Sequence, residues 1–214
     1  PFTFGTQDEL RWIATTGGES QLIEKSKNRA TPHFVKGNDR IYLYGSEGLQ
    51  SIRWDGTDEK TIVKITGITV YGSLNDILDD HHHSLPETAT EPQKKPSDAD
   101  LIMMAPEGDQ AMAKINNEIY TVTIPYAGGE TITINVADAS KAAFPARKLT
   151  KIGGEFPSWS SDAKLAYWSI GNAFFTYDLA AGKARDEEIA AKKKAEAAEK
   201  AAAAKKKKEE GGEE

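Results

Sequence analysis

The sequence of 214 residues predicts an all-β fold followed by one charged, non-β segment. Short runs in which apolar and polar residues alternate, such as 41–43, are typical of strands that bury one face. The runs are separated by Gly- or Asn-containing turns at hairpin spacing, for example 46–48 and 116–117. The same order of turn and strand recurs along the chain, which indicates several small antiparallel sheets.

The first part of the chain is expected to form a hairpin and then three strands. Apolar and polar residues alternate over 10–14, and the Gly-Gly pair within 16–19 predicts a turn into a second strand. Three further strands are expected at 41–43, 49–54 and 61–65, joined by two tight turns.

Residues 76–99 interrupt this pattern. They contain three Pro, many acidic residues and few apolar ones, so we expect a polar insertion that is solvated or disordered. Strand patterning then resumes, with the last two strands expected to pair as a hairpin through Gly128-Gly129. The predicted strands of this part are 101–104, 111–115, 118–124 and 131–136.

The tail, residues 183–214, consists mostly of Ala, Lys and Glu. Its helix propensity is high but it has no apolar face, which predicts an exposed helix or a disordered linker. It carries 10 Lys and Arg against 9 Asp and Glu, and residues 1–182 carry 17 against 24. The Glu residues of the tail and the acidic remainder argue against nucleic acid or anionic lipid as a partner. No apolar run is long enough to predict a membrane span.

Three segments align on a large apolar anchor: Phe34, Met104 and Trp159. Each anchor precedes an acidic turn, a strand, a Gly or Asn turn and a second strand; the first apolar strand residue follows after 7, 7 and 6 positions. Such a small sheet cannot bury both faces alone, whereas radial stacking of several sheets buries them against one another. The repeat therefore predicts part of a β-propeller, in which the hairpin at 10–22 is the outer half of a further unit.

The third unit, Trp159-Ser160-Ser161-Asp162-Ala163-Lys164, resembles the TolB-like propeller repeat, which reads roughly Trp-Ser-Pro-Asp-Gly-Lys before an apolar strand. Ser161 stands where that unit has Pro, and Ala163 where it has Gly, and the turn is one residue short before Leu165. The resemblance implies three to four blades or part-blades of four-stranded antiparallel sheets. The expected segments are blades over 1–75 (the first incomplete), the insertion 76–99, blades over 100–182 and the linker 183–214.

The longer run from Phe144 to Leu179, with its charged tail, is similar to the propeller of large bacterial proteins, secreted or periplasmic, in which a TolB-like propeller precedes an amidohydrolase domain. The resemblance implies a non-catalytic scaffold, substrate-access or assembly role here, with a divalent metal such as zinc in the hydrolase domain. The first residue is Pro and three blades do not close a ring, so we expect a fragment. Its expected partners are the remaining propeller or catalytic domain of the precursor or a companion chain, and an oligomer is expected.

Two other functions remain open at this point. One is a periplasmic propeller that binds a protein or peptide by itself. The other is the access propeller of a prolyl-oligopeptidase-like or tricorn-like peptidase. The sequence has no Gly-x-Ser-x-Gly nucleophile motif and no Cys, and its paired glycines precede no helix, so no catalytic or cofactor-binding residue is assigned.

Asp79-Asp80-His81-His82-His83 is the most obvious candidate metal site. His81 and His83 have the His-x-His spacing that amidohydrolases use, and the neighbouring carboxylates supply oxygen ligands. The motif lies in the Pro-rich polar insertion, however, and the only other His in the sequence is His33. We expect a solvated loop there, with adventitious metal binding and a catalytic centre as the alternatives.

Acidic turns and aromatic residues give two further candidates. The acidic turns offer one or two carboxylates each, which favours a structural turn over a calcium site. The aromatic residues have strand spacing and apolar neighbours, which favours core packing over a carbohydrate or peptide platform. The acidic residues are Asp39, Asp58, Asp109 and Asp162, and the aromatic residues are Trp12, Trp54, Trp159, Tyr167 and Trp168.

Overall fold

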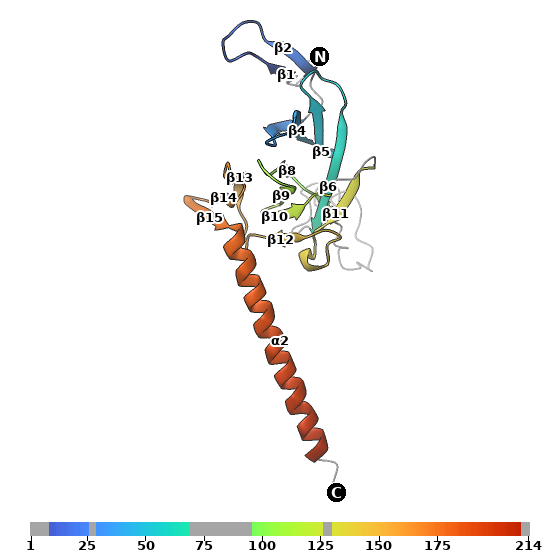
Figure 1. Cartoon of the computed structure of the whole chain (residues 1–214), viewed down its shortest axis with the longest axis vertical. Helices are drawn as coiled ribbons and strands as arrows, with labels where there is room; N and C mark the ends of the chain where they lie inside the picture. The colour runs from blue at the N-terminus through green and yellow to red at the C-terminus, as the bar shows by residue number, and fades with distance from the viewer. Residues whose placement is uncertain (1–8, 26–28, 69–95, 126–129, 211–214) are drawn as a thin grey trace, which may run out of the picture.

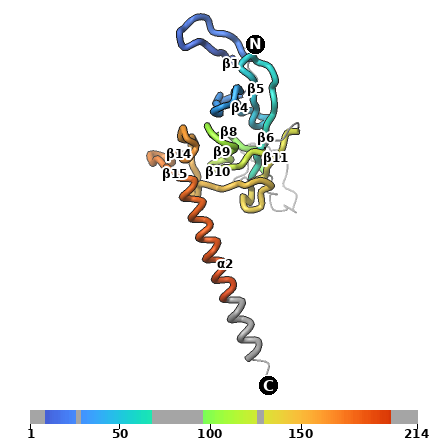
Figure 2. The backbone as a smooth tube through the Cα atoms, viewed as in Figure 1, coloured from blue at the N-terminus to red at the C-terminus, as the bar shows by residue number. Residues whose placement is uncertain are grey.

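The computed structural model describes residues 9–25, 29–68, 96–125 and 130–210, shown in colour in Figure 1. The described chain forms several mostly antiparallel sheets and one long helix, so the predicted all-β class is confirmed at that level. We name the sheets A to D in the order in which the chain enters them. After its first three strands in sheet C the chain returns once to sheet B and once to sheet C before it enters sheet D, and the helix extends away from the sheets (Figure 2).

Sheets A and B contain the first part of the chain. Sheet A is the predicted hairpin, and sheet B is a four-stranded meander, β3 to β6, to which β7 and β11 are added at β6. The strands of sheet A are β1 (Glu9–Trp12) and β2 (Gln21–Lys25). Those of sheet B are β3 (Ala30–Phe34), β4 (Arg40–Gly45), β5 (Gly48–Arg53), β6 (Lys60–Ile68), β7 (Pro96–Asp98) and β11 (Ile132–Asn135).

Sheets C and D contain the second part. Sheet C is a four-stranded antiparallel sheet and sheet D has three strands, after which the helix begins at once. The strands of sheet C are β8 (Leu101–Met104), β9 (Gln110–Ile115), β10 (Glu118–Thr123) and β12 (Ala146–Lys148). Those of sheet D are β13 (Glu155–Trp159), β14 (Leu165–Ile170) and β15 (Ala173–Asp178). A short 3-10 turn, η2 (Ala139–Lys141), precedes β12, and the helix is α2 (Leu179–Glu210).

The three segments aligned on Phe34, Met104 and Trp159 form the same local structure. In each case the anchor is the last residue of a strand, and a turn and two antiparallel strands follow. The predicted order of anchor, turn, strand, turn and strand is therefore present in sheets B, C and D.

Three features differ from the sequence prediction. Residues 131–136 do not pair with β10 as a hairpin, because β11 instead lies parallel to β6, with Ile132 opposite Val63. Residues 96–98, assigned to the polar insertion, form β7 against the end of β6. The helix begins at Leu179, before the predicted tail, because Asp178 Oδ1 accepts a hydrogen bond from the Ala181 backbone N–H at 2.8 Å and so caps its first turn.

Each pair of consecutive sheets encloses its own hydrophobic core. Ile41, Leu43 and Ile52 of sheet B pack with Leu10 and Ile23 of sheet A. The largest core lies between sheets B and C, and a third lies between sheets C and D. The second core includes Tyr42, Leu49, Val63, Ile65, Ile102, Ala111, Ala113, Ile115 and Val122. The third is built from Met112, Ile119, Leu149, Ala166 and Trp168.

A buried cation also fixes sheet A to sheet B. The Arg29 side chain is only 5 % exposed, and its guanidinium forms ion pairs with Glu24 of β2 and, at 2.9 Å, with Glu59 just before β6. A buried guanidinium must be paired to remain charged at acceptable cost. The pairing therefore determines where the hairpin of sheet A lies on sheet B.

The three anchor turns need a residue in the left-handed backbone region. Gly37 and Gly108 have φ of 76° and 86°, and in the third turn Ala163 has φ of 57°. Ala163, which stands where the TolB-like unit has Gly, thus places a Cβ where the left-handed backbone disfavours one. Hydrogen bonds compensate: Ser160 Oγ accepts from the Leu165 backbone N–H at 2.9 Å and donates to Asp162 Oδ1 at 2.6 Å.

Replacing Ala163 by Gly should therefore stabilise the protein. Relief of the left-handed strain outweighs the added freedom of the unfolded chain, and we expect a gain of about 0.5–1 kcal/mol. Urea unfolding monitored by circular dichroism measures it. The matched control is Gly37→Ala, where an added Cβ meets no atom within 4 Å, so that only the backbone preference acts and stability should fall. A midpoint unchanged in both variants would contradict the argument.

Candidate functional site

The first strands of sheets B, C and D, β3, β8 and β13, lie next to one another through hydrogen bonds at their last two residues. The Met104 backbone N–H donates to His33 Nε2 at 2.9 Å, and Trp159 Nε1 donates to the Met103 carbonyl at 3.2 Å. The residue before each anchor thus contacts the anchor of the next sheet. The adjoining turns of sheets B and C also meet, since the Lys36 backbone N–H donates to the Pro106 carbonyl at 2.7 Å.

His33 is the most specifically placed side chain in this junction. Because its Nε2 accepts from a backbone N–H, the proton of the neutral ring lies on Nδ1, which donates to the Thr31 carbonyl at 2.7 Å. Burial lowers the pKa of His33 from its ordinary value of 6.5, and the hydrogen bond to Thr31 opposes this only in part. The ring is therefore a neutral structural bridge between sheets B and C.

Stability should consequently decrease as the pH falls below 6.5. The unfolded state binds a proton at His33 more readily than the folded state, so acid favours unfolding in the window from 6.5 down to the lowered folded-state pKa. Urea unfolding at a series of pH values measures this slope. His33→Gln keeps an acceptor and a donor but does not titrate, so its slope should be shallower than that of the wild type. Equal slopes in both proteins would exclude His33 as the cause.

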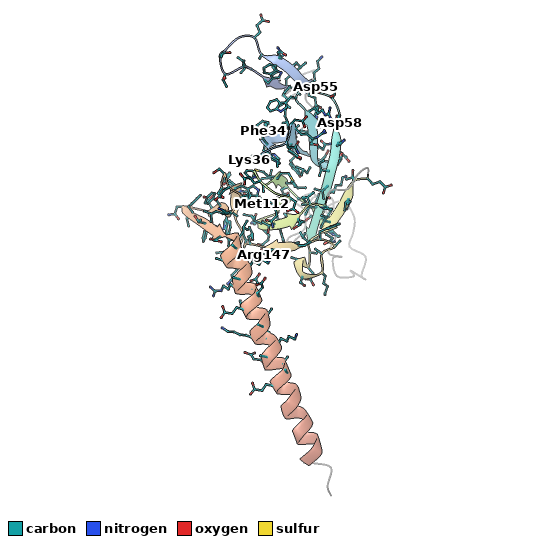
Figure 3. The ribbon with its side chains drawn as sticks, viewed as in Figure 1. Phe34, Lys36, Asp55, Asp58, Met112 and Arg147 are labelled. Carbon is teal, nitrogen blue, oxygen red and sulfur yellow. The ribbon has the colours of Figure 1, made fainter. Side chains whose placement is uncertain are left out.

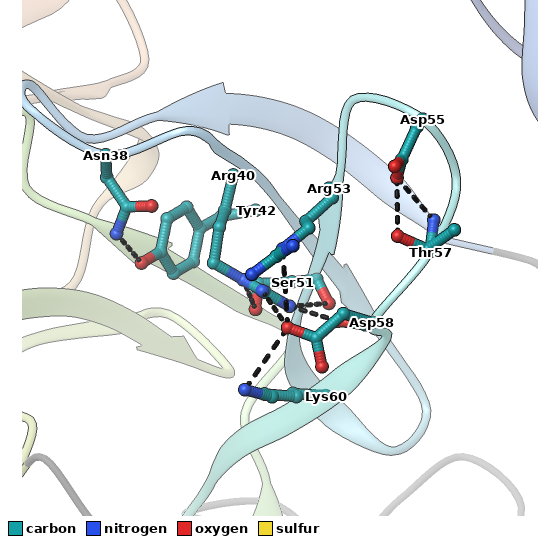
Figure 4. A network of polar contacts seen from close by, with 9 residues as sticks. All are labelled: Asn38, Arg40, Tyr42, Ser51, Arg53, Asp55, Thr57, Asp58 and Lys60. Carbon is teal, nitrogen blue, oxygen red and sulfur yellow. Dashed lines mark hydrogen bonds and ion pairs between the residues drawn. The ribbon is translucent and has the colours of Figure 1, made fainter.

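A polar network covers the beginning of β6 (Figure 4). Asp58 Oδ2 lies 2.7 Å from Arg40 Nη1, 3.3 Å from Lys60 Nζ and 3.6 Å from Arg53 Nε. The hydrogen bond from Arg40 is the main cause that lowers the pKa of Asp58. Arg40 also donates to Ser51 Oγ at 2.9 Å, which ties β4 to β5. The carboxylate is thus engaged by three cations, and its chemistry is that of a structural ion pair.

The acidic turns show the same pattern. Asp162 accepts from Ser160 and, at 3.2 Å, from the Lys164 backbone N–H, and these bonds lower its pKa. In the described ranges no three His, Asp or Glu side chains are placed to hold a metal ion, and Asp39, Asp58, Asp109 and Asp162 do not converge. The candidate ligands His81 and His83 lie outside the described residues. A hollow beside β6 and β7, lined by Tyr44, Lys64 and Asp98, has room for about one water molecule.

The aromatic residues divide into a buried and an exposed group. Trp168 is buried between sheets C and D, and Trp159 is half-buried. The expectation of core packing is wrong for Trp12 and Trp54, which are exposed, and the anchor Phe34 is exposed as well. Phe34 and Trp54 stack with ring centroids 5.2 Å apart, and Tyr167 and Phe174 stack at 5.6 Å on sheet D.

Arg147 of β12 lies where α2 leaves the sheets (Figure 3). Its guanidinium donates to the carbonyls of Leu179 and Gly182, pairs with Asp186 at 2.6 Å and lies 5.5 Å from the centre of the Tyr177 ring. Gly182 has no side chain and so allows the helix to approach the Tyr177 hydroxyl. These contacts hold the first two turns of α2 against sheets C and D.

Sequence reasoning did not identify His33, Arg40 or Arg147 as organising residues. Their partners come from other sheets or from distant turns, and no local motif indicates such pairs. The sequence did indicate that the turn at Ala163 is unusual, because Ala163 stands where the TolB-like unit has Gly. The hairpin spacing also predicted the turns at 46–48, 116–117 and 171–172.

No family model matches this chain, and no curated protein or solved structure matches it significantly. Within the part of the chain that the structure describes, no helix combines the length and apolar character needed to cross a bilayer.

Proposed function

We propose that this chain is a non-catalytic segment of a TolB-like β-propeller with a scaffold, substrate-access or assembly role. The parent protein in this proposal is amidohydrolase-like and acts in the periplasm or outside the cell. The observation that carries the proposal is the junction of β3, β8 and β13, at which the first strand of each repeat unit meets that of the next.

Radial stacking requires this arrangement. In a propeller the first strands of the sheets lie closest to a common axis and the last strands lie outermost. The His33–Met104 and Trp159–Met103 contacts join corresponding positions of successive units, as a rotation from sheet to sheet would produce. The separate cores between sheets A and B, B and C, and C and D fit the same arrangement.

The polar groups support a scaffold role. Asp58 and Asp162 are engaged in hydrogen bonds and ion pairs of the fold. His33 uses both ring nitrogens, Nε2 for Met104 of sheet C and Nδ1 for the Thr31 carbonyl of its own strand. A general base or a metal ligand needs a lone pair that is available to a substrate or an ion. The TolB-like resemblance of the Trp159 unit supplies the family, and the amidohydrolase association follows from that resemblance.

Distances between spin labels test the radial arrangement. The chain has no Cys, so labels can be attached at introduced cysteines without background. One pair, Asp39→Cys and Asp109→Cys, lies just before the second strands of sheets B and C. The other pair, Lys60→Cys and Lys148→Cys, lies on their fourth strands. A radial arrangement predicts a longer distance for the second pair by pulsed electron paramagnetic resonance, and equal distances would indicate a flat stack.

An activity assay tests the non-catalytic role. The purified chain should not hydrolyse amide or ester substrates above the buffer rate, with or without added Zn²⁺. A His81→Ala, His83→Ala double variant is the control. Metal-dependent hydrolysis by the wild type that disappears in the double variant would overturn the proposal.

A further inference from the structure

We propose that the open edge of β15 binds an extended polypeptide segment as a fourth strand of sheet D, antiparallel to β15 and with a Lys or Arg opposite Thr176. The proposal deepens the proposed function and rests on it: the segment belongs to the remainder of the parent protein. It adds the place at which that remainder attaches and the residue type that the segment carries.

Sheet D ends at its third strand, whereas sheets B and C continue beyond theirs. β5 pairs with the antiparallel strand β6, and β10 pairs with the antiparallel strand β12. Within the described residues β15 pairs with β14 alone, and it leads directly into α2 (Figure 1). Sheets B and C therefore show what covers the corresponding edge, which is an antiparallel strand.

β15 also lacks the features that keep the edges of natural sheets from pairing. Edge strands are usually short, charged, bulged or interrupted by Pro. β12 has three residues, two of them basic, and the first strands β3 and β13 contain Pro and a break in register. β15 has six residues in unbroken register with β14, and its one charged residue, Asp178, is the last. Such an edge is a template for a further strand.

The repeat predicts the residue type opposite the middle of β15. Ser51, Thr121 and Thr176 are the fourth residues of β5, β10 and β15, so the three positions correspond. Ser51 and Thr121 are 0 % and 5 % exposed, whereas Thr176 is exposed. Lys60 lies opposite Ser51, and Arg147 lies opposite Thr121. Both sheets thus place a basic residue opposite the small hydroxyl residue, and we expect the same in sheet D.

A carboxylate complements the basic residue in each sheet. Lys60 pairs with Asp58 at 3.3 Å, and Arg147 pairs with Asp186 at 2.6 Å. In sheet D the carboxylate is Asp178, which lies on the same face of β15 as the fourth residue and two positions after it. A side chain opposite the fourth residue is therefore a diagonal neighbour of Asp178, within reach of a Lys or Arg.

The residues on either side of the basic one face sheet C. Phe175 and Tyr177 pack against the core that sheets C and D share, and both are half-buried. A fourth strand places one side chain beside each of these rings, where β-branched apolar residues bury the most surface. The segment is thus a Lys or Arg between two apolar residues.

The backbone of Thr176 faces the open edge. In sheet C the Thr123 backbone N–H donates to the Pro145 carbonyl just before β12. Residues two apart in a strand direct their backbone groups to the same side, so Thr121 faces β12 as well. By the correspondence of the strands, Thr176→Pro removes a donor from the open edge and leaves the bonds to β14 in place.

Fluorescence anisotropy of the full chain with the fluorescein-labelled peptide Ser-Thr-Val-Lys-Val-Thr-Ser tests the proposal. The peptide should bind saturably to the wild type. Thr176→Pro should raise the Kd by at least about tenfold, because one bond of the ladder is lost and the ring obstructs the edge. Thr176→Val keeps the N–H and is the matched control, with a Kd within about twofold of the wild type.

Modified peptides repeat the test on the wild-type chain, without dependence on the folding of a variant. Methylation of the backbone nitrogen of the peptide's Lys removes the donor that faces the Thr176 carbonyl and should weaken binding by at least about tenfold. Methylation of the following Val is the control, because its N–H points away from β15. This second peptide should bind like the unmodified one.

The charge requirement is tested by exchanging the Lys of the peptide for Glu. The Glu peptide should bind the wild type at least about threefold more weakly, because it lies beside Asp178. Asp178→Asn should abolish the difference between the two peptides. Asn is as good a helix cap as Asp, so this variant keeps the start of α2.

Three results would each overturn the proposal: no saturable binding, no effect of the Lys methylation, or equal binding of the Lys and Glu peptides to the wild type. A wild-type dimer in sedimentation velocity that Thr176→Pro dissociates would show that a second copy occupies the edge, and would overturn it as well. The spin-label and activity tests are independent of β15, so the proposed function stands if they succeed and the peptide does not bind.

Discussion

A Gly48→Ala variant should lose about 3 kcal/mol of stability, one of the two largest single-residue effects expected in this protein. Gly48 begins β5 with φ of 96°, a left-handed conformation that costs any other residue strain. A Cβ there would also overlap the Val63 carbonyl oxygen of the adjacent strand β6. That oxygen belongs to the backbone of a central strand and cannot move aside without disturbing the sheet. Urea unfolding monitored by tryptophan fluorescence measures the loss.

Gly108→Ala separates the two causes. Gly108 has φ of 86°, and an added Cβ there meets no atom within 4 Å. This control should therefore cost only the backbone strain, about 1 kcal/mol. If both variants lost the same stability, the steric argument for Gly48 would be wrong.

Trp168→Ala should cost about 3 kcal/mol, within the range measured for large aromatic residues in protein cores. Trp168 is 6 % exposed and packs between sheets C and D, with its ring stacked 5.9 Å from that of Phe175. The core that it occupies is the smaller of the two that sheet C shares, and it packs one face of sheet D against sheet C. We therefore expect sheet D to detach before the rest of the chain unfolds.

Limited proteolysis followed by mass spectrometry detects this detachment as early cleavage within 155–178. Phe174→Ala is the control on the same sheet. Phe174 lies on the opposite face and is 71 % exposed, so its loss should change the stability of the monomer by less than about 0.5 kcal/mol. Cleavage distributed evenly over sheets B, C and D in Trp168→Ala would show that sheet D does not open first.

The strands and turns of sheets B to D could be predicted because they follow local rules. Alternation over 41–43 and the Gly turn at Gly48 determine a strand pair without reference to any other part of the chain. The long exposed helix was also foreseeable from the Ala, Lys and Glu composition, although its first residue was not. Leu179 begins the helix because Asp178 caps it, and a single Asp after a strand is a weak signal.

The partners of the strands were less predictable. β11 looks like the second strand of a hairpin with β10, yet Ile134 of this strand and Val136 just after it are buried in the core shared by sheets B and C. Burying both there favours the parallel place beside β6, and the local turn residues do not encode that choice. The exposure of Phe34 and Trp54 could likewise not be predicted from the sequence, since it depends on how little of sheet B the hairpin of sheet A covers. In the candidate site, the roles of His33 and Arg147 depend on the same long-range arrangement.

The helix α2 has a mechanical consequence. Its 32 residues span about 48 Å, and without an apolar face the rod has no reason to fold back onto the sheets. It is attached at its base, where Arg147 donates to the carbonyls of Leu179 and Gly182 and pairs with the carboxylate of Asp186. Because the helix is held near its base, a tilt of about 10° at Arg147 would displace its far end by about 8 Å. A small rearrangement at the edge of sheet C is thus amplified along the helix, and the contacts of Arg147 set the direction in which the helix points.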